Sequence, residues 1–148
     1  MKPTKNPYGI ISVLIFLSAV IVISGCIDGS APDAADKTKM QSEIQIVLDE
    51  QCDAIKNKDI DALMATFDKE SSGKYDEMKT GWEMAFLDVN VTGCKMAIAG
   101  LEVKGDMVTV EIEGTMTSML LSTGETKTEN FTETDKFKKV ESEWKQVY

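Results

Sequence analysis

The sequence predicts an α+β domain in which N-terminal helices pack on an antiparallel sheet of about four strands. Three observations support this prediction. Apolar residues recur at helical spacing up to about Asp88, they alternate with polar residues after it, and short polar turns divide the second half of the chain. Helices followed by a run of neighbouring strands are typical of α+β folds, in which the helices cover one face of the sheet.

The chain of 148 residues begins with a segment that is typical of export signals. Lys2 and Lys5 precede an apolar run from Ile10 to Ile23, which is shorter than the roughly 20 residues of a membrane-spanning helix. Small residues and then Cys26 follow, a pattern that resembles the lipobox of prokaryotic lipoproteins. The resemblance implies that residues 1–25 are removed as a signal peptide and that Cys26 carries a lipid. The alternative is an uncleaved N-terminal anchor, and both place the rest of the chain at the outer face of a membrane.

Residues 26–37 are small, polar and acidic, and we expect a flexible tether between the lipid and the domain. A single domain is expected to span residues 38–148. Thr38 and Gln41 form a capping-box pattern, which predicts a long helix that begins there and ends near Lys58. One face of this helix is apolar, with Met40, Ile44, Val47, Leu48, Cys52 and Ile55.

Two shorter helices are expected next. Asp59 is a suitable N-cap for a second helix, and Ser71-Ser72-Gly73 breaks the pattern after it. The apolar face of the second helix holds Ile60, Leu63, Met64 and Phe67. A third helix is expected to bury Tyr75, Met78, Trp82, Ala85 and Phe86.

Strands are predicted after Asp88, where the apolar period changes to two. Residues 89–103 are rich in β-formers, and Val108, Val110 and Ile112 then alternate with polar residues after a turn at Lys104-Gly105-Asp106. Gly114 indicates a bulge or a bend in this second strand. Residues 126–140 are predicted as a long third strand, and residues 144–148 as a closing strand after a polar turn.

Residues 54–67 (AIKNKDIDALMATF) place a polar turn with Asp between two amphipathic helices, and residues 137–145 (FKKVESEWK) place a Trp after a polar turn. These two stretches resemble the nuclear transport factor 2-like (SnoaL-like) superfamily of cystatin-like domains. The resemblance covers about residues 40–148. It implies a cone-like fold, in which a curved sheet wraps around the long first helix and often encloses an apolar pocket. The superfamily includes isomerases, dehydratases, polyketide cyclases and non-catalytic binding modules, so the fold does not decide the function.

Composition excludes several functions. The net charge is −9, all basic residues are lysine, and there is no histidine. Nucleic acid is an unsuitable partner because binding to a phosphate backbone needs a basic face. Histidine-dependent catalysis and histidine-ligated metal sites are excluded. We find no motif for a cofactor or a metal, and no catalytic residue that carries over from the superfamily, so none is predicted.

Cys52 and Cys94 remain as a pair if Cys26 is lipidated. In an oxidising compartment two such cysteines form a disulfide or stay buried as free thiols. The sequence leaves both possibilities open, because it does not show whether the two Cα atoms come within about 7 Å.

Four aromatic residues are candidates for the lining of a ligand pocket: Trp82, Phe86, Phe131 and Phe137. The alternative is ordinary core packing. Glu133 and Asp135 share one parity with Phe131 and Phe137, so a regular strand points them into the same pocket, where burial raises a carboxyl pKa. We favour the opposite expectation, in which a bulge or an exposed strand end turns both carboxylates to solvent.

Asn90-Val91-Thr92 and Asn130-Phe131-Thr132 are glycosylation sequons, used only if the host modifies exported proteins. Taken together, the sequence favours a lipid-anchored module on the extracytoplasmic side of the cell membrane. We expect it to be non-enzymatic and to bind a small apolar ligand or an envelope protein partner. One alternative is a pocket enzyme of the isomerase or dehydratase type that uses carboxylates and tyrosine. The other is a purely structural surface lipoprotein.

Overall fold

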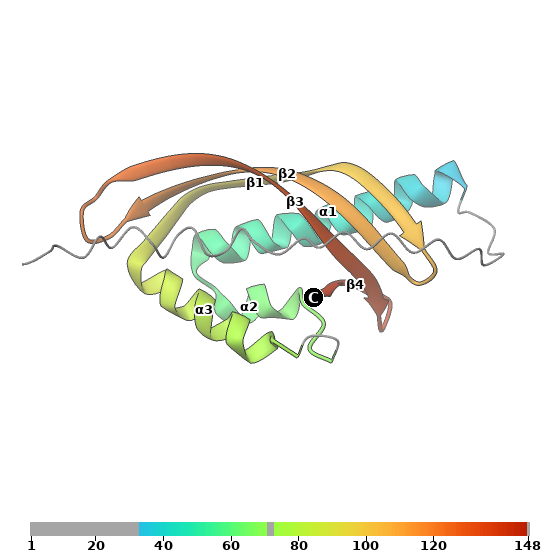
Figure 1. Cartoon of the computed structure of the whole chain (residues 1–148), viewed down its shortest axis with the longest axis horizontal. Helices are drawn as coiled ribbons and strands as arrows, with labels where there is room; N and C mark the ends of the chain where they lie inside the picture. The colour runs from blue at the N-terminus through green and yellow to red at the C-terminus, as the bar shows by residue number, and fades with distance from the viewer. Residues whose placement is uncertain (1–32, 71–72, 148) are drawn as a thin grey trace, which may run out of the picture.

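The computed structural model of the chain describes residues 33–70 and 73–147. These residues form three helices and then one antiparallel sheet of four strands in the order β1-β2-β3-β4 (Figure 1). The predicted α+β class is confirmed. The elements are α1 (Ala34–Asn57), α2 (Ile60–Ala65), α3 (Tyr75–Asp88), β1 (Val89–Lys104), β2 (Met107–Leu120), β3 (Thr126–Val140) and β4 (Glu143–Val147).

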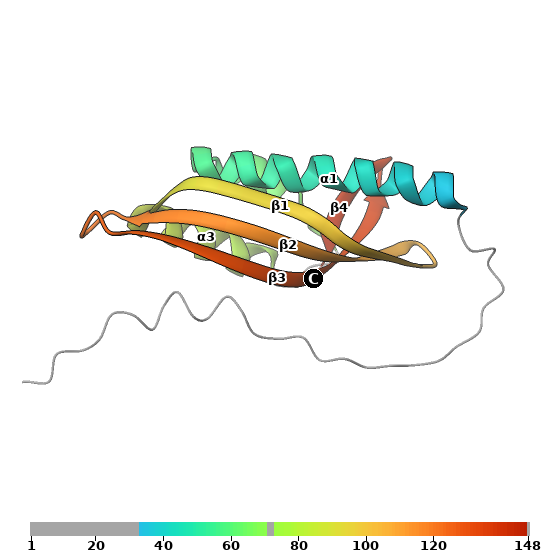
Figure 2. The ribbon, with the colours of Figure 1, turned by 90° about the horizontal axis from the view of Figure 1, so that it is seen from above.

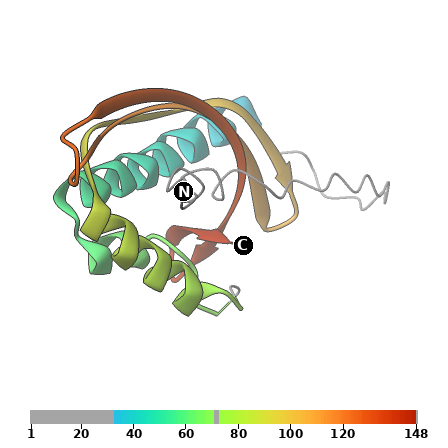
Figure 3. The same ribbon diagram turned by 60° about the vertical axis from the view of Figure 1, so that its left-hand side comes forward.

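The sheet is strongly curved, and α1 lies along its concave side (Figure 1). Seen from above, α1 runs alongside β1 (Figure 2). Figure 3 shows the sheet curling around α1, with α2 and α3 on the side opposite the strands. The long strands β1, β2 and β3 form the wall of this half-cone, and the short β4 pairs with the end of β3 at the edge of the sheet. The cone-like arrangement implied by the superfamily resemblance is confirmed.

The start of α1 differs from the prediction. Asp33 is the N-cap, and its Oδ1 accepts a hydrogen bond of 2.8 Å from the Asp36 N–H. Thr38 is inside the helix, where its Oγ1 donates to the carbonyl of Ala34 at 2.9 Å. The capping box at Thr38 is therefore wrong, and the first turn of α1 lies within the predicted 26–37 tether. The predicted signal segment and Cys26 lie outside the described residues.

The junction of the three helices follows the predicted pattern. Lys58 ends α1 in the left-handed conformation (φ 55°), and Asp59 caps α2 by accepting a 2.9 Å hydrogen bond from the Ala62 N–H. Polar contacts attach α3 to the other two helices. Lys58 Nζ donates to the Phe86 carbonyl at 2.5 Å, the Tyr75 hydroxyl donates to the Met64 carbonyl at 3.1 Å, and Lys79 pairs with Asp61 at 3.1 Å.

The strands are joined by tight turns. Gly105 and Gly124 have φ of 64° and 72°, and Glu141 and Ser142 have φ of 50° and 77°. Positive φ at both central residues matches the twist of a two-residue hairpin. The register of β2 and β3 is continuous at Gly114, whereas β1 shifts register between Val91 and Gly93 and between Ile98 and Gly100. The predicted bulge at Gly114 is therefore wrong, and the irregularities lie in β1.

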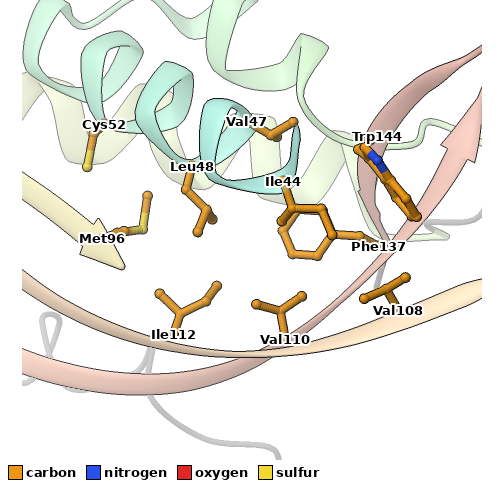
Figure 4. Packing of buried hydrophobic residues seen from close by; sticks show 10 residues of the cluster. All are labelled: Ile44, Val47, Leu48, Cys52, Met96, Val108, Val110, Ile112, Phe137 and Trp144. Atoms are coloured by element: carbon orange, nitrogen blue, oxygen red, sulfur yellow. The ribbon is translucent and has the colours of Figure 1, made fainter. Parts of the chain in front are cut away.

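Two apolar clusters form the core. The first joins α1 to the sheet (Figure 4) and consists of Ile44, Val47, Leu48, Cys52, Met96, Val108, Val110, Ile112, Phe137 and Trp144. The second lies at the helix junction and consists of Ala54, Ile55, Leu63, Met64, Phe67 and Val91. Helix α3 contributes no buried residue and packs on the second cluster with half-buried side chains. It is therefore the most loosely packed of the three helices.

Candidate functional site

The concave face of β3 carries the candidate site. Along this strand Phe131, Glu133, Asp135 and Phe137 pair with Gly114, Ile112, Val110 and Val108 of β2, without a register shift. The three aliphatic partners are buried in the first cluster, on the side of the sheet that faces α1. Because side chains alternate along a strand, the two acids lie on the same concave face as the two phenylalanines. The expected bulge is therefore absent, and Asp135 is half-buried, but Glu133 is exposed to solvent as the expectation of an exposed strand has it.

The two phenylalanines differ in their surroundings. Phe137 is 0% exposed and belongs to the packed core. Phe131 is half-buried, and its ring lies directly over Gly114, since a Cβ added at Gly114 would come within 2.2 Å of the ring. Gly114 therefore makes room for the ring, and Phe131 provides an apolar wall beside Glu133.

The two carboxyl groups differ in their contact with water, since Asp135 is half-buried and Glu133 is exposed. Asp135 is half-buried, and burial followed by the negative charge of Glu133 raises its pKa to about 7. Burial also raises the pKa of Glu133, although this residue keeps more contact with water than Asp135. Asp135 is therefore the acid that the surroundings perturb most. No described residue makes a hydrogen bond or an ion pair with either carboxyl group.

A buried polar network borders this face where β4 pairs with β3. Gln51 of α1 donates to the Thr66 hydroxyl at 3.0 Å and to the Gln146 side-chain oxygen at 2.7 Å. Gln146 pairs with Phe137 across β3 and β4. These three polar side chains satisfy one another, so they fix the helix junction against the sheet.

The other two predicted aromatic residues lie on α3. The rings of Trp82 and Phe86 are 5.7 Å apart between centroids, and both are half-buried. They pack on the second cluster together with Met116, which is the next inward-facing residue after Gly114 on β2. The structure therefore places the α3 aromatics on the second cluster, whereas Phe131 packs against the first.

Two surface cavities lie away from the acids. One of about 400 Å³ lies between α1 and α2, and the other, of about 410 Å³, lies at the start of α1. In the second cavity Glu43 pairs with Lys139 at 2.9 Å and accepts a hydrogen bond from the Trp144 indole at 2.8 Å, so its pKa is held below the usual range. None of the residues that line this cavity was predicted as part of a site. Its only sequence signal is the Trp after the last turn.

Cys52 and Cys94 are joined by a disulfide, with their Cα atoms 5.3 Å apart. The bond connects α1 to β1. Cys52 belongs to the first cluster and Cys94 packs against both clusters, so the bond fixes the boundary between them.

The two sequon asparagines lie on the convex face of the sheet. Asn90 pairs with Met119, and Asn130 pairs with Thr115, whose hydroxyl donates to the Asn130 side-chain oxygen at 2.8 Å. Both positions are therefore on the opposite side of the sheet from the acids.

Within the described residues, no group of three or more acids or cysteines is placed to hold a metal ion. In that part of the chain there is also no helix with the length and hydropathy needed to cross a membrane.

Solved structures with low sequence identity share the fold. A ketosteroid isomerase-like protein from Erwinia carotovora atroseptica has a TM-score of 0.61 and 18% identity, covering 74% of this chain and 92% of that chain. A nuclear transport factor 2-like protein from Salmonella enterica has a TM-score of 0.61 and 12% identity, covering 75% and 88%. A putative dehydratase of the same superfamily from Streptomyces avermitilis has a TM-score of 0.59 and 11% identity, covering 74% and 92%.

Sequence comparison is more specific. No curated protein matches the sequence. A family model does match, over residues 46–148, which is most of the chain and includes all four strands. Its description is the C-terminal domain of the anti-sigma-I factor RsgI9. This chain belongs to that family.

Proposed function

We propose that this chain is a non-enzymatic binding module that a lipid on Cys26 holds at the outer face of the cell membrane. Its ligand is a small, mostly apolar molecule that binds on the concave face of the sheet. One observation carries the proposal. Asp135 and Glu133 lie on that face beside Phe131, and no described residue pairs with either carboxyl group.

The chemistry of this face defines the ligand. Phe131 is half-buried, so part of its ring offers apolar surface, and an aromatic or alicyclic body gains from covering it. The two carboxyl groups accept hydrogen bonds, each worth about 1.5–3 kcal/mol when a charged group takes part. A hydroxyl or an amine on an apolar body matches both features, whereas an anion is repelled by the acids.

Membrane attachment rests on the sequence around Cys26 and on the basic, apolar segment before it. The family relationship supports the binding role. An anti-sigma factor is a regulatory protein, and a C-terminal domain of such a protein is one unit of a larger regulator. A domain of this family therefore suits ligand or partner recognition better than metabolic turnover.

One observation favours a second candidate, a pocket enzyme that transfers protons. The pKa of Asp135 is raised to about 7, which is the range in which a carboxyl group can both take and give a proton near neutral pH. The two candidates differ in what they require of this residue. A binding module needs an acceptor at this position, and an enzyme needs an ionisable group.

The test uses 2-naphthol as a probe with a hydrogen-bond donor and 2-methoxynaphthalene as the matched probe without one. We expect 2-naphthol to bind more tightly in a fluorescence titration, and Asp135→Leu, which removes the acceptor, to weaken its binding. Glu113→Gln, on the convex face of β2, is the control and should leave the affinity unchanged. Equal binding of both probes, or equal effects of both variants, would contradict the proposal.

The enzyme candidate has its own readout. The α-protons of 2-tetralone exchange with deuterium in D₂O when a general base removes them, and NMR follows this exchange. The binding module should not accelerate it. An acceleration that disappears in Asp135→Asn would favour the enzyme instead.

A further inference from the structure

Exposed apolar side chains gather at one end of α3. Among the described residues, the exposed large hydrophobic side chains are Ile46 at 56%, Met84 at 64%, Leu87 at 77% and Leu121 at 48%. Met84 and Leu87 lie in the last two turns of α3. Leu121 joins them because its N–H donates to the Asp88 carbonyl at 2.9 Å, which brings the β2–β3 turn to the end of α3. Ile46 lies apart from them on α1.

These side chains belong to neither of the two apolar clusters of the core. Met84 and Leu87 are three residues apart and so share one face of the helix. The half-buried residues that pack on the second cluster, Trp82 and Phe86 among them, lie on the other face. The exposed leucine and methionine are therefore available to another molecule, and an adjacent group of such residues marks an interaction site more often than a single one does.

The charge around these residues indicates what kind of molecule can bind to them. Glu83 lies one turn before Leu87, and Asp88 and Glu125 border the contact between α3 and the β2–β3 turn. The nearby lysines are already engaged, since Lys79 pairs with Asp61 and Lys58 donates to the Phe86 carbonyl. The rim is therefore acidic. An anionic membrane surface is repelled by it, and a second copy of this chain would bring like charges together.

We propose that Met84, Leu87 and Leu121, with Glu83, Asp88 and Glu125 around them, form a docking surface for a basic amphipathic segment of a partner protein. We call this set the outer α3 patch. The partner segment covers the three apolar side chains with its own apolar face and places lysines or arginines against the three acids. This surface is separate from the concave face of β3, so the inference does not depend on the small-molecule ligand.

The test uses a labelled amphipathic helical peptide made of leucine and lysine, with a leucine–glutamate peptide as its matched control. Fluorescence anisotropy measures binding to the full chain in discs of zwitterionic lipid, with empty discs as background. We expect Leu87→Ser to weaken binding of the lysine peptide by about tenfold, the loss that follows when one leucine is no longer covered. Ile46→Ser removes an exposed apolar residue from α1 and should change the affinity less than about twofold.

Charge is tested with a second pair of variants. Glu83→Gln and Glu50→Gln change the net charge equally, but Glu50 lies on α1. We expect the first to weaken binding more than the second, and the glutamate peptide to bind neither form. Equal effects of the two serine variants, or of the two glutamine variants, would overturn the proposal, because binding would then depend on nonspecific hydrophobic contact or on net charge. If the lipid disc alone already slows hydrogen exchange at residues 84–88, the patch binds lipid and the proposal is overturned. If the chain forms a dimer that Leu87→Ser dissociates, the patch binds a second copy of the chain and the proposal is overturned as well.

Discussion

Replacing Asp135 by asparagine should make the stability of the domain less dependent on pH. The carboxyl pKa is about 7 in the folded chain, against an ordinary value of 3.8, because burial and the charge of Glu133 disfavour ionisation. At a pH below the ordinary pKa of 3.8, the Asp135 carboxyl group is protonated in both the folded and the unfolded chain, so its ionisation does not change the stability. As pH rises from there to about 7, the unfolded chain releases the proton that the folded chain keeps, so the free energy of unfolding falls.

The size of this loss follows from the shift. Each unit of pKa corresponds to about 1.4 kcal/mol, so a shift of about three units sets an upper limit of about 4 kcal/mol. Water still reaches the half-buried carboxyl group, and this screening reduces the expected loss to about 2 kcal/mol. Asparagine has nearly the same shape and cannot ionise. Asp135→Asn should therefore be more stable than the natural chain by about 2 kcal/mol at about pH 8, and this gain should shrink toward about pH 4.

The assay is urea unfolding followed by tryptophan fluorescence at several pH values in this range. Glu113→Gln on the convex face is the matched control, for which we expect a change within about 0.5 kcal/mol throughout. Glu133→Gln should make the Asp135 effect smaller, since it removes the neighbouring negative charge. If the free energies of unfolding of Asp135→Asn and the natural chain differ by the same amount at both ends of the pH range, the pKa of Asp135 is not raised by folding.

Three further predictions concern packing, the disulfide and the anchor. Gly114→Ala should destabilise the domain by about 1–3 kcal/mol, because the added Cβ meets the Phe131 ring, and thermal unfolding should show this cost shrinking in a Phe131→Leu background. Replacing both Cys52 and Cys94 by serine should lower the free energy of unfolding by about 4 kcal/mol, since the bond closes a loop of 42 residue steps, and a loss under about 1 kcal/mol in urea unfolding would contradict this. Cys26→Ser should change either the processing of the signal or the anchoring of the protein, and mass spectrometry of a natural protein that begins at Met1 without lipid would contradict this prediction.

Much of the fold follows from local sequence signals. The spacing of apolar residues on α1 and the cap at Asp59 predict the helix junction, and the alternation around Val110 predicts β2. The start of α1 was mispredicted because two cap-type residues compete. Asp33 forms the cap, while Thr38 satisfies its hydroxyl within the helix, which makes the capping-box pattern misleading.

The candidate site depends on contacts that the sequence does not contain. The parity of Glu133 and Asp135 is visible in the sequence, but whether β3 stays regular depends on its pairing with β2. The fit of the Phe131 ring over Gly114 joins residues of two strands, and neither residue predicts the other. The unpaired state of the acids is likewise a property of the curved sheet, because it depends on which side chains the other elements bring near.

The central claim is that the concave face of β3 binds the ligand, and NMR shift mapping with 2-naphthol tests it most directly. Backbone and side-chain carboxyl signals of the labelled full chain would be followed during the titration. We expect the largest chemical-shift changes at Phe131, Glu133 and Asp135, with the Asp135 carboxyl signal among them. Changes that cluster instead at the Glu43–Trp144 cavity or on the outer face of α3, with β3 unaffected, would contradict the account.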